Sequence, residues 1–403
     1  MRYVLVGGGV ASAATAAGLR KRGFDGEVVV IADEAEPPYE RPPLSKDFLG
    51  GTEVVPARAP SWYADNDVEL RLGTRATALD LGGRTVRLTA GDDLGYDALV
   101  LATGLRPRRL PGFDGERIHH LRTAADARGL RAELADAQRL VILGAGFIGC
   151  EVASSAVALG KQVTIFEPER APLARALGAR IGGVLLDIHR GRGVEIRAGE
   201  YIESMTRTAA GLVLTSNLGH TVECDLVLVG VGARPNVELA VAAGIDTGDG
   251  ILVDEYGRTS APDVYALGDV AAQVHHGTRV RVEHHDNALR QGRTVAANLT
   301  GEAVPHTDAH WFWSDQYDHT LQSVGRARDL DDLVVRGSVE EQRFAAFSLT
   351  DGRIDAVIAL NRPGDVLAVR RVLHTPHEVT AEALRDESVP LKQLLRTVAE
   401  EVS

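Results

Sequence analysis

The chain has 403 residues, with 44 Lys or Arg against 56 Asp or Glu and a formal net charge of −12. That length predicts more than one hydrophobic core, and a hydrophobic content of 44% excludes a disordered or collagen-like chain. The negative charge argues against a general nucleic-acid-binding protein, and two cysteines are too few for a disulfide framework or a four-thiolate metal centre. The sequence shows neither an uncharged apolar run of membrane-spanning length nor a signal-peptide pattern, and we expect a cytoplasmic protein without a membrane span.

The first predicted elements come in the order strand, turn, helix and strand, at residues 3–6, 7–12, 13–22 and 28–31. The turn reads GGGVAS, and Asp33 follows the second strand. This order is typical of a dinucleotide-binding unit. Gly7 allows the tight turn, Gly9 lets the backbone approach a pyrophosphate, and Ser12 is a small substitute for the third glycine. Taken alone, the pattern also fits an ordinary strand–turn–helix.

The same order recurs at residues 140–143, 144–149, 150–159 and 163–166. Here the turn reads GAGFIG, so Gly144, Gly146 and Gly149 fill all three glycine positions, and Glu167 follows the second strand. Two such units predict two dinucleotides. A carboxylate at Glu167 suits a free ribose 2′-hydroxyl and repels a 2′-phosphate, which favours NADH. Arg170 lies close enough in sequence to keep NADPH open as an alternative.

Three further strand runs end in polar or glycine residues, at 100–104, 226–232 and 263–269. The first ends in Thr103-Gly104. The last ends in Gly268-Asp269, where a carboxylate can meet a polyol at the carboxyl edge of a sheet. After a predicted helix at 286–299 the composition changes, with WFW at 311–313 and alternating strands around an Asp-Gly turn at 351–352. This part predicts a separate α+β domain.

Four segments resemble the FAD-dependent, NADH-linked ferredoxin reductases that serve bacterial P450s and ring-hydroxylating oxygenases. They are YERPPLSK at 39–46, the Thr-Gly at 103–104, residues 265–269 and WFWSDQ at 311–316. The resemblance spans essentially the whole chain. It implies an α/β fold like that of glutathione reductase, with two Rossmann-like domains and a C-terminal α+β domain. The implied domains are FAD-binding at 1–107 and 233–306, NADH-binding at 108–232 and C-terminal at 307–403.

The resemblance also implies the residues that hold each cofactor. For FAD they are Gly7, Gly9, Ser12, Asp33, Arg41, Lys46, Thr103, Gly104, Gly268, Asp269 and Trp313. For NADH they are Gly144, Gly146, Gly149, Glu151 and Glu167. Lys46 and Trp313 would lie beside the flavin ring, and Glu151 would reach the nicotinamide carboxamide and pair with Lys46, so these three are the expected catalytic residues. Each has a plainer interpretation too: a solvated loop charge for Arg41 or Lys46, a turn cap for Asp269, a core aromatic for Trp313, and an acid favoured by the helix dipole for Glu151.

The implied activity is hydride transfer from NADH to FAD, followed by single-electron transfer to a [2Fe–2S] ferredoxin. A rubredoxin or quinone reductase is the alternative within the same class, and a flavin-bearing signalling or binding protein is the alternative from another class. Because the chain is acidic, an acidic ferredoxin would need a local basic landing site, for which the candidates are Arg290, Arg293, Arg370 and Arg371.

The cysteines and histidines predict no further redox or metal site. Cys150 and Cys224 are wrongly placed for a disulfide reductase, and we interpret both as small buried hydrophobic residues. Only His374 and His377 have a helical spacing suited to a metal, and no acid or thiol partner marks the site, so we expect no metal. His284 and His285 precede the helix whose N-terminus would face the flavin, where they would alter its surroundings in a direction that the sequence does not fix.

Overall fold

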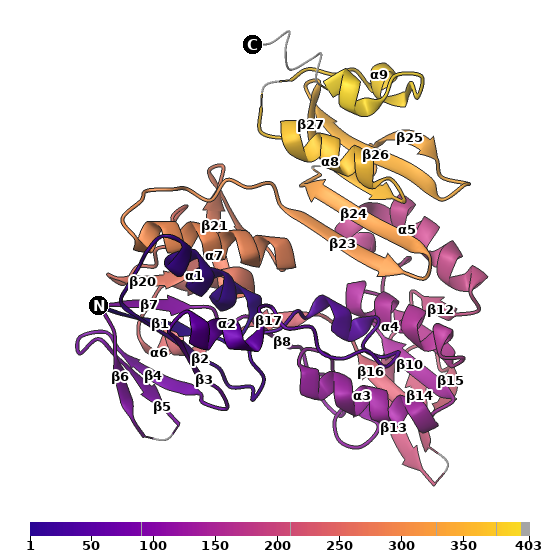
Figure 1. Cartoon of the computed structure of the whole chain (residues 1–403). Helices are drawn as coiled ribbons and strands as arrows, with labels where there is room; N and C mark the ends of the chain where they lie inside the picture. Colours follow the sequence, from indigo (N-terminus) through magenta and orange to yellow (C-terminus); the bar gives the residue numbers. More distant parts are fainter. Residues whose placement is uncertain (90, 210, 328, 376, 396–403) are drawn as a thin grey trace. The chain divides into compact units, whose positions relative to one another are not determined.

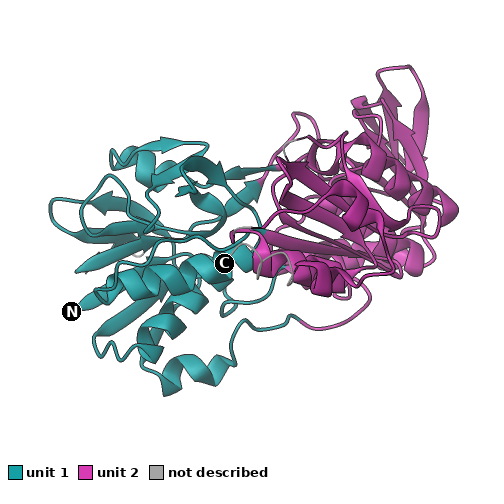
Figure 2. Ribbon diagram, turned by 90° about the horizontal axis from the view of Figure 1, so that it is seen from above, with its two compact units in different colours: residues 1–41, 54–106, 233–310 teal, residues 42–53, 107–232, 311–403 magenta. Residues whose placement is uncertain are grey.

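The computed structural model describes residues 1–89, 91–209, 211–327, 329–375 and 377–395. They divide into two compact units (Figure 2). Unit 1 contains Met1–Arg41, Val54–Arg106 and Ala233–His310, and unit 2 contains Pro42–Glu53, Pro107–Gly232 and the described residues from Trp311 onward. The predicted NADH-binding domain falls in unit 2, as does the predicted C-terminal domain from Trp311 onward, whereas its residues 307–310 fall in unit 1. The three-domain division and its boundaries remain a proposal. Residues 396–403 of the predicted C-terminal domain lie outside the described residues.

The core of unit 1 is a five-stranded parallel sheet. Its strand order is β20 (Val264–Ala266), β7 (Ala98–Leu101), β1 (Arg2–Val6), β2 (Glu27–Ile31) and β3 (Val68–Arg71). Apart from the edge strand β3, the strands are near-continuous apolar runs, as expected where both faces of a sheet are buried. Successive side chains point to opposite faces, so Val4 and Val6 enter one hydrophobic cluster while Tyr3 and Leu5 enter another.

Helices α1 (Val10–Lys21) and α7 (His285–Leu299) pack together on one face of this sheet (Figure 1). Glycines permit the close approach: a Cβ on Gly292 would lie 2.7 Å from the Ala11 carbonyl oxygen, and one on Gly18 would lie 2.6 Å from Ala296 Cβ. α1 begins at Val10 rather than at the predicted Ala13, because the end of the glycine-rich turn already forms its first helical turn.

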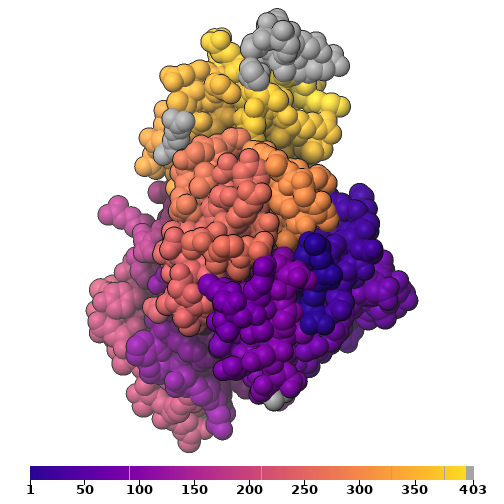
Figure 3. All heavy atoms as spheres, turned by 90° about the vertical axis from the view of Figure 1, so that its left-hand side faces the viewer, coloured from indigo at the N-terminus to yellow at the C-terminus, as the bar shows by residue number. Residues whose placement is uncertain are grey.

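The remaining elements of unit 1 are antiparallel strands and short helices. On the second face, β4 (Ala76–Asp80), β5 (Thr85–Leu88) and β6 (Asp93–Gly95) form one small sheet. Another contains β18 (Thr247–Gly248), β19 (Gly250–Val253), β21 (Ala271–His275) and β22 (Thr278–Arg281). β8 (Leu105–Pro107) pairs with β17 (Ala233–Pro235), and the helices are α2 (Pro60–Asp65) and α6 (Glu238–Ala242). In Figure 3 the orange atoms of 233–310 adjoin the purple atoms of 54–106, two pieces of unit 1 that are far apart in sequence.

Unit 2 contains a second five-stranded parallel sheet. Its order is β12 (Glu195–Ala198), β11 (Gln162–Glu167), β10 (Arg139–Leu143), β16 (Leu226–Val229) and β9 (Ile118–His119). Helices α3 (Ala124–Asp136) and α4 (Phe147–Ala158) accompany it, as does an antiparallel sheet of β13 (Ile202–Thr208), β14 (Gly211–Ser216) and β15 (Thr221–Cys224). α4 begins at Phe147 rather than at the predicted Cys150, for the same reason as α1.

The C-terminal part of unit 2 is an antiparallel sheet with helices α8 (Pro363–Val372) and α9 (Ala381–Arg385). Its order is β23 (Trp311–Gln316), β24 (His319–Gly325), β27 (Arg353–Leu360), β26 (Arg343–Thr350) and β25 (Val334–Ser338). The predicted Asp351-Gly352 hairpin is confirmed, since both residues adopt positive φ, at 50° and 74°. α5 (Ala174–Gly191) packs Leu177, Ile181 and Leu185 against this sheet, which joins the predicted NADH-binding and C-terminal domains. No helix among the described residues has the length and apolar character needed to cross a membrane.

Candidate functional site

The first glycine-rich turn, between β1 and α1, is shaped to admit a ligand beside the backbone. Gly7 has φ of +133°, and a Cβ there would lie 2.1 Å from the Ala102 carbonyl oxygen, so the protein itself requires glycine. At Gly9, the N-cap of α1, a Cβ would meet no protein atom within 4 Å. The space over Gly9 is thus open, and the unbonded N–H groups at the start of α1 suit a phosphate.

Ser12 supports the same interpretation from inside the first turn of α1. Its side chain is fully buried, and its Oγ has no hydrogen-bond partner among the described residues. A buried hydroxyl without a partner is costly unless a ligand completes its bonding. Asp33, two residues after β2, is exposed and lies 3.8 Å from Arg75, so its carboxylate is available to a ribose hydroxyl. These residues fit the adenosine diphosphate half of FAD.

Arg41 is held by neighbouring side chains of unit 1. Its guanidinium donates to Glu34 Oε1 at 2.7 Å and to the Tyr39 hydroxyl at 3.1 Å, and it lies over the Tyr39 ring. The Tyr39 hydroxyl in turn donates to Glu34 Oε2 at 2.5 Å. Arg41 is therefore an oriented cation and not a solvated loop charge. Its predicted contact with the pyrophosphate stays a prediction.

The Thr-Gly segment follows β7, inside the unit 1 sheet, and the Gly-Asp segment follows the neighbouring edge strand β20. Thr103 Oγ1 donates to the Asn236 carbonyl oxygen at 2.7 Å, and the Asn236 amide donates back to the Thr103 carbonyl at 2.8 Å. Gly268 has φ of +74°, and its N–H donates to Gln291 of α7 at 2.7 Å. The structure thereby ties Gly268 and the adjacent Asp269 to the helix predicted to face the flavin.

Two histidines stand at the N-terminus of that helix. His284 is the N-cap of α7, and His285 Nε2 lies against the Glu40 carboxylate. Burial lowers the pKa of His284 to about 4, against the opposing influence of Asp269 and Asp286. His284 is consequently neutral at physiological pH, and the positive end of the helix dipole has no added imidazolium charge from this residue.

The second glycine-rich turn, between β10 and α4, repeats the geometry of the first. A Cβ on Gly144 (φ of +100°) would lie 2.6 Å from the Gly230 carbonyl oxygen, and one on Gly149 would lie 2.1 Å from the Gly144 carbonyl oxygen. Gly146 is the N-cap of α4, and a Cβ there would meet only the Gly230 carbonyl oxygen, at 4.0 Å. Glu167, the last residue of β11, accepts the Ala145 N–H at 2.6 Å and the Glu169 N–H at 2.8 Å. The carboxylate is therefore fixed beside the turn, where an adenosine ribose would bind.

The structure brings together Lys46 and Glu151, two of the three expected catalytic residues. Lys46 Nζ lies 2.9 Å from Glu151 Oε2, and both side chains are largely buried. Two hydroxyls also donate hydrogen bonds to the Glu151 carboxylate: Ser45 donates to Oε2 at 2.5 Å, and Ser314 of β23 donates to Oε1 at 2.6 Å. All four residues belong to unit 2. The predicted pair exists in the structure, and the solvated-loop interpretation of Lys46 does not hold.

Trp313 lies on β23, one residue before Ser314. Its ring stacks on that of Trp311, with centroids 5.0 Å apart and an interplanar angle of 20°, and Arg370 of α8 lies over the Trp311 ring. The side chain of Trp313 is half-buried rather than enclosed in the core. Its role beside the flavin remains a prediction.

The two cysteines are free and buried. Burial raises the pKa of the Cys224 thiol to about 12, and it raises that of Cys150 well above its usual range. Both are therefore unreactive thiols at physiological pH.

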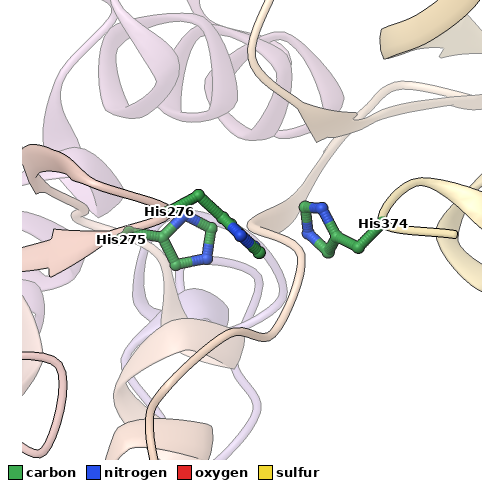
Figure 4. A group of neighbouring side chains, drawn as sticks. All are labelled: His275, His276 and His374. Atoms are coloured by element: carbon green, nitrogen blue, oxygen red, sulfur yellow. The ribbon is translucent and has the colours of Figure 1, made fainter.

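The histidines are placed as follows. Figure 4 shows His275 and His276, which belong to unit 1, and His374, which belongs to unit 2. His377 uses both ring nitrogens in unit 2, with Nε2 accepting the Ile354 N–H and Nδ1 near the Thr375 carbonyl oxygen. His377 thus serves local structure, and the absence of a metal at His374 and His377 stays an expectation.

Comparisons with known proteins show extensive similarity. Residues 1–292 match the pyridine nucleotide-disulphide oxidoreductase family, and residues 311–395 match the reductase C-terminal family. The chain is 37% identical to putidaredoxin reductase of Pseudomonas putida over 414 residues, covering 99% of this chain and 98% of that protein. It is 40% identical to the ferredoxin–NAD(+) reductase component of the anthranilate 1,2-dioxygenase system of Burkholderia cepacia, covering 98% and 99%. The structure matches the covalent putidaredoxin reductase–putidaredoxin complex with a TM-score of 0.94 at 36% identity, over 98% of each chain.

Proposed function

The chain belongs to the pyridine nucleotide-disulphide oxidoreductase family, and from that premise we propose that it is an FAD-dependent NADH:ferredoxin reductase. Its partner is a [2Fe–2S] ferredoxin that serves a P450 or ring-hydroxylating oxygenase. The proposal rests above all on the two glycine-rich cradles, each followed by a carboxylate, in a chain similar over its whole length to ferredoxin reductases of oxygenase systems. The unreactive cysteines argue against disulfide chemistry in this member of the family.

When bound, FAD supplies the chemistry that accepts a hydride from NADH and releases electrons singly. The residues of the chain bind FAD and NADH and orient them. Gly7, Gly9 and Ser12 accommodate one pyrophosphate, and the turn at 144–149 accommodates the other. Glu151, fixed by Lys46 and two serine hydroxyls, presents a carboxylate to the nicotinamide carboxamide. No group of the protein needs to move a proton in the hydride step.

The four candidate landing residues for ferredoxin differ in how much charge they offer. Arg290 is already paired with Asp286 and Asp308, at 2.8 and 2.5 Å, which leaves little net positive charge. Arg293 and Arg371 are exposed. We expect Arg371→Glu to raise the ferredoxin KM about fivefold or more and to reduce its dependence on salt. The matched control is Arg343→Glu, a charge reversal on β26, and equal effects of the two variants would count against a landing site at Arg371.

A cytoplasmic location is part of the same proposal, because two free cysteines suit a reducing compartment. The function is tested by stopped-flow reduction of the bound flavin with NADH, followed by steady-state turnover with a panel of ferredoxins. Fast flavin reduction and ferredoxin turnover are expected. Slow flavin reduction would favour a signalling or binding role, and turnover with only rubredoxin or only a quinone would identify that molecule as the electron acceptor in place of a ferredoxin.

A further inference from the structure

A chain of hydrogen-bonded polar side chains leads away from Glu151, and all of its members except the half-buried Tyr317 are buried. On the side opposite Lys46, Glu151 Oε1 accepts from the Ser314 hydroxyl at 2.6 Å. Ser314 Oγ accepts from Gln316 Nε2 at 3.1 Å, and Gln316 Oε1 lies 3.0 Å from His189 Nε2. His189 Nδ1 lies 2.8 Å from the Tyr317 hydroxyl. All of these residues belong to unit 2, on α4, α5 and the β23–β24 hairpin (Figure 1).

The carboxylate fixes the direction of every hydrogen bond in this chain. A carboxylate only accepts, so Ser314 must donate to Glu151 and must therefore accept from the amide nitrogen of Gln316. The amide oxygen of Gln316 then faces His189, which must carry its proton on Nε2. Nδ1 is left as an acceptor, and the Tyr317 hydroxyl donates to it. The donors thus all point their protons in one direction, toward Glu151, and such bonds polarise one another.

We propose that Tyr317, His189 and Gln316 are positioning residues that act through Ser314 to hold Glu151 in its NADH-binding orientation. The proposal rests on the function assigned above, since it gives Glu151 its role at the nicotinamide. It assigns a function to three side chains that lie outside the cofactor-binding set. Without them Ser314 would be free to turn its hydroxyl away, and Glu151 Oε1 would lose its donor while Oε2 kept Ser45 and Lys46.

The surroundings keep the direction of the chain constant. His189 is fully buried, and burial lowers its pKa to about 4, so the imidazole stays neutral. Burial raises the pKa of Tyr317 above its usual range, so the phenol keeps its proton. Arg192 lies over the Tyr317 ring, where its charge favours the phenol as a donor. The Tyr317 backbone is anchored to α4, because its N–H donates to Ser154 Oγ at 2.6 Å.

Two variants test the chain at different links. Tyr317→Phe removes a single oxygen, which leaves His189 Nδ1 without its donor and takes the outermost hydrogen bond away. Gln316→Glu keeps the shape of the side chain but makes it an acceptor only, so that it competes with Glu151 for the Ser314 proton. Tyr201→Phe is the matched control, because it removes the same oxygen from a half-exposed tyrosine of unit 2 that does not belong to the row of hydrogen bonds.

The first measurement needs no catalytic activity. Nitrogen-15 NMR of histidine rings in the holoenzyme, with His189 identified by the signals lost in His189→Phe, reports the position of the proton. We expect the Nε2–H form of His189 without titration between about pH 5.5 and 8. Tyr317→Phe should keep this form, because Gln316 Oε1 still requires it, and should change the nitrogen-15 shift of Nδ1, which loses its hydrogen bond. An Nδ1–H form in the unaltered protein would overturn the proposal.

The second measurement is stopped-flow reduction of the flavin, with the NADH Kd and the limiting rate determined separately. A hydrogen bond to a charged group stabilises more than one between neutral groups. The variants do not remove the Ser314 hydroxyl that donates to Glu151 but leave it less firmly oriented, so only part of that stabilisation is lost. We therefore expect the NADH Kd to rise about threefold to tenfold in Tyr317→Phe and about tenfold or more in Gln316→Glu, with unchanged oxidation of the reduced enzyme by ferricyanide. If Gln316→Glu fails to fold, Tyr317→Phe alone decides.

The outcomes separate this proposal from the function on which it rests. If NADH does not reduce the flavin of the unaltered enzyme, the proposed function fails, and the positioning role of Tyr317, His189 and Gln316 fails with it. If NADH reduces that flavin normally and Tyr317→Phe behaves like Tyr201→Phe in both Kd and rate, the function stands and the positioning role is refuted.

Discussion

A Gly7→Ala variant places a methyl group where the backbone of Ala102 already lies. The added Cβ would be 2.1 Å from the Ala102 carbonyl oxygen and 2.6 Å from its carbon, well inside ordinary contact. The φ of +133° adds strain of about 1–3 kcal/mol for a residue other than glycine. The clash also displaces the ends of β1 and β7. We expect the strain and this displacement together to lower the stability of the FAD-free protein by about 3–5 kcal/mol.

Gly9→Ala, two residues further along the same turn, is the matched comparison. A Cβ there meets no protein atom within 4 Å, and the N-cap φ of −99° is open to alanine. Alanine is a slightly poorer N-cap but restricts the unfolded chain, so the stability of the FAD-free protein should change by no more than about 0.5 kcal/mol. The methyl group would instead separate the backbone from a pyrophosphate, and FAD affinity should fall about tenfold or more.

The two effects are measured on FAD-stripped protein. Thermal and urea unfolding give the stability of each variant, and titration with FAD, followed by the quenching of flavin fluorescence, gives its affinity. The reasoning is refuted if Gly9→Ala binds FAD as the unaltered protein does, because the pyrophosphate then does not lie over Gly9. It is equally refuted if Gly7→Ala is as stable as Gly9→Ala.

Three further outcomes are expected. The kcat/KM for NADH should exceed that for NADPH at least about tenfold, because the fixed Glu167 carboxylate repels a 2′-phosphate; a preference for NADPH would contradict this. Turnover with ferredoxin should stay within about twofold in Cys150→Ala and Cys224→Ala, since neither thiol is ionised, and a larger loss would point to thiol chemistry. Lowering the pH from about 7 to about 5 should cost about 2 kcal/mol of folding stability through His189. The pKa of His189 is about 4 in the folded state and about 6.5 in the unfolded state. The unfolded chain therefore takes up the proton first as the pH falls, which favours unfolding. Urea unfolding checks this against His189→Phe, in which that part of the pH dependence should disappear.

The dinucleotide-binding units could be predicted because their signal is local. A strand, a turn, a helix and an acid follow one another within about 30 residues, and the first residue of each turn, Gly7 or Gly144, has a positive φ and no room for a Cβ. The helix starts were the inaccurate part. The last residues of each glycine turn are read as loop in a sequence, whereas the structure winds them into the first helical turn, from which unbonded N–H groups point outward.

The surroundings of Glu151 could be predicted only in part. The pairing with Lys46 was predicted from the family resemblance, but Ser45 and Ser314 were missed. They lie 106 residues before and 163 residues after Glu151, and a serine carries no spacing signal over such a distance. Their positions next to Lys46 and Trp313 in the family segments were the one available hint. His189 was missed because its place in α5 reads as an ordinary buried position.

The division of unit 1 among three stretches of chain affects how the protein is made. During synthesis, residues 107–232 emerge as one continuous block that already contains all five strands of the unit 2 parallel sheet. The unit 1 sheet lacks β20 at that stage, and α1 lacks α7, the helix against which it packs. The edge of the unit 1 sheet at β7 therefore stays unpaired until about 300 residues have been made, and an unpaired edge favours aggregation during that interval. A chain truncated after residue 232 would keep that edge open permanently, so synthesis of the region through α7 is the step on which the solubility of the N-terminal half depends.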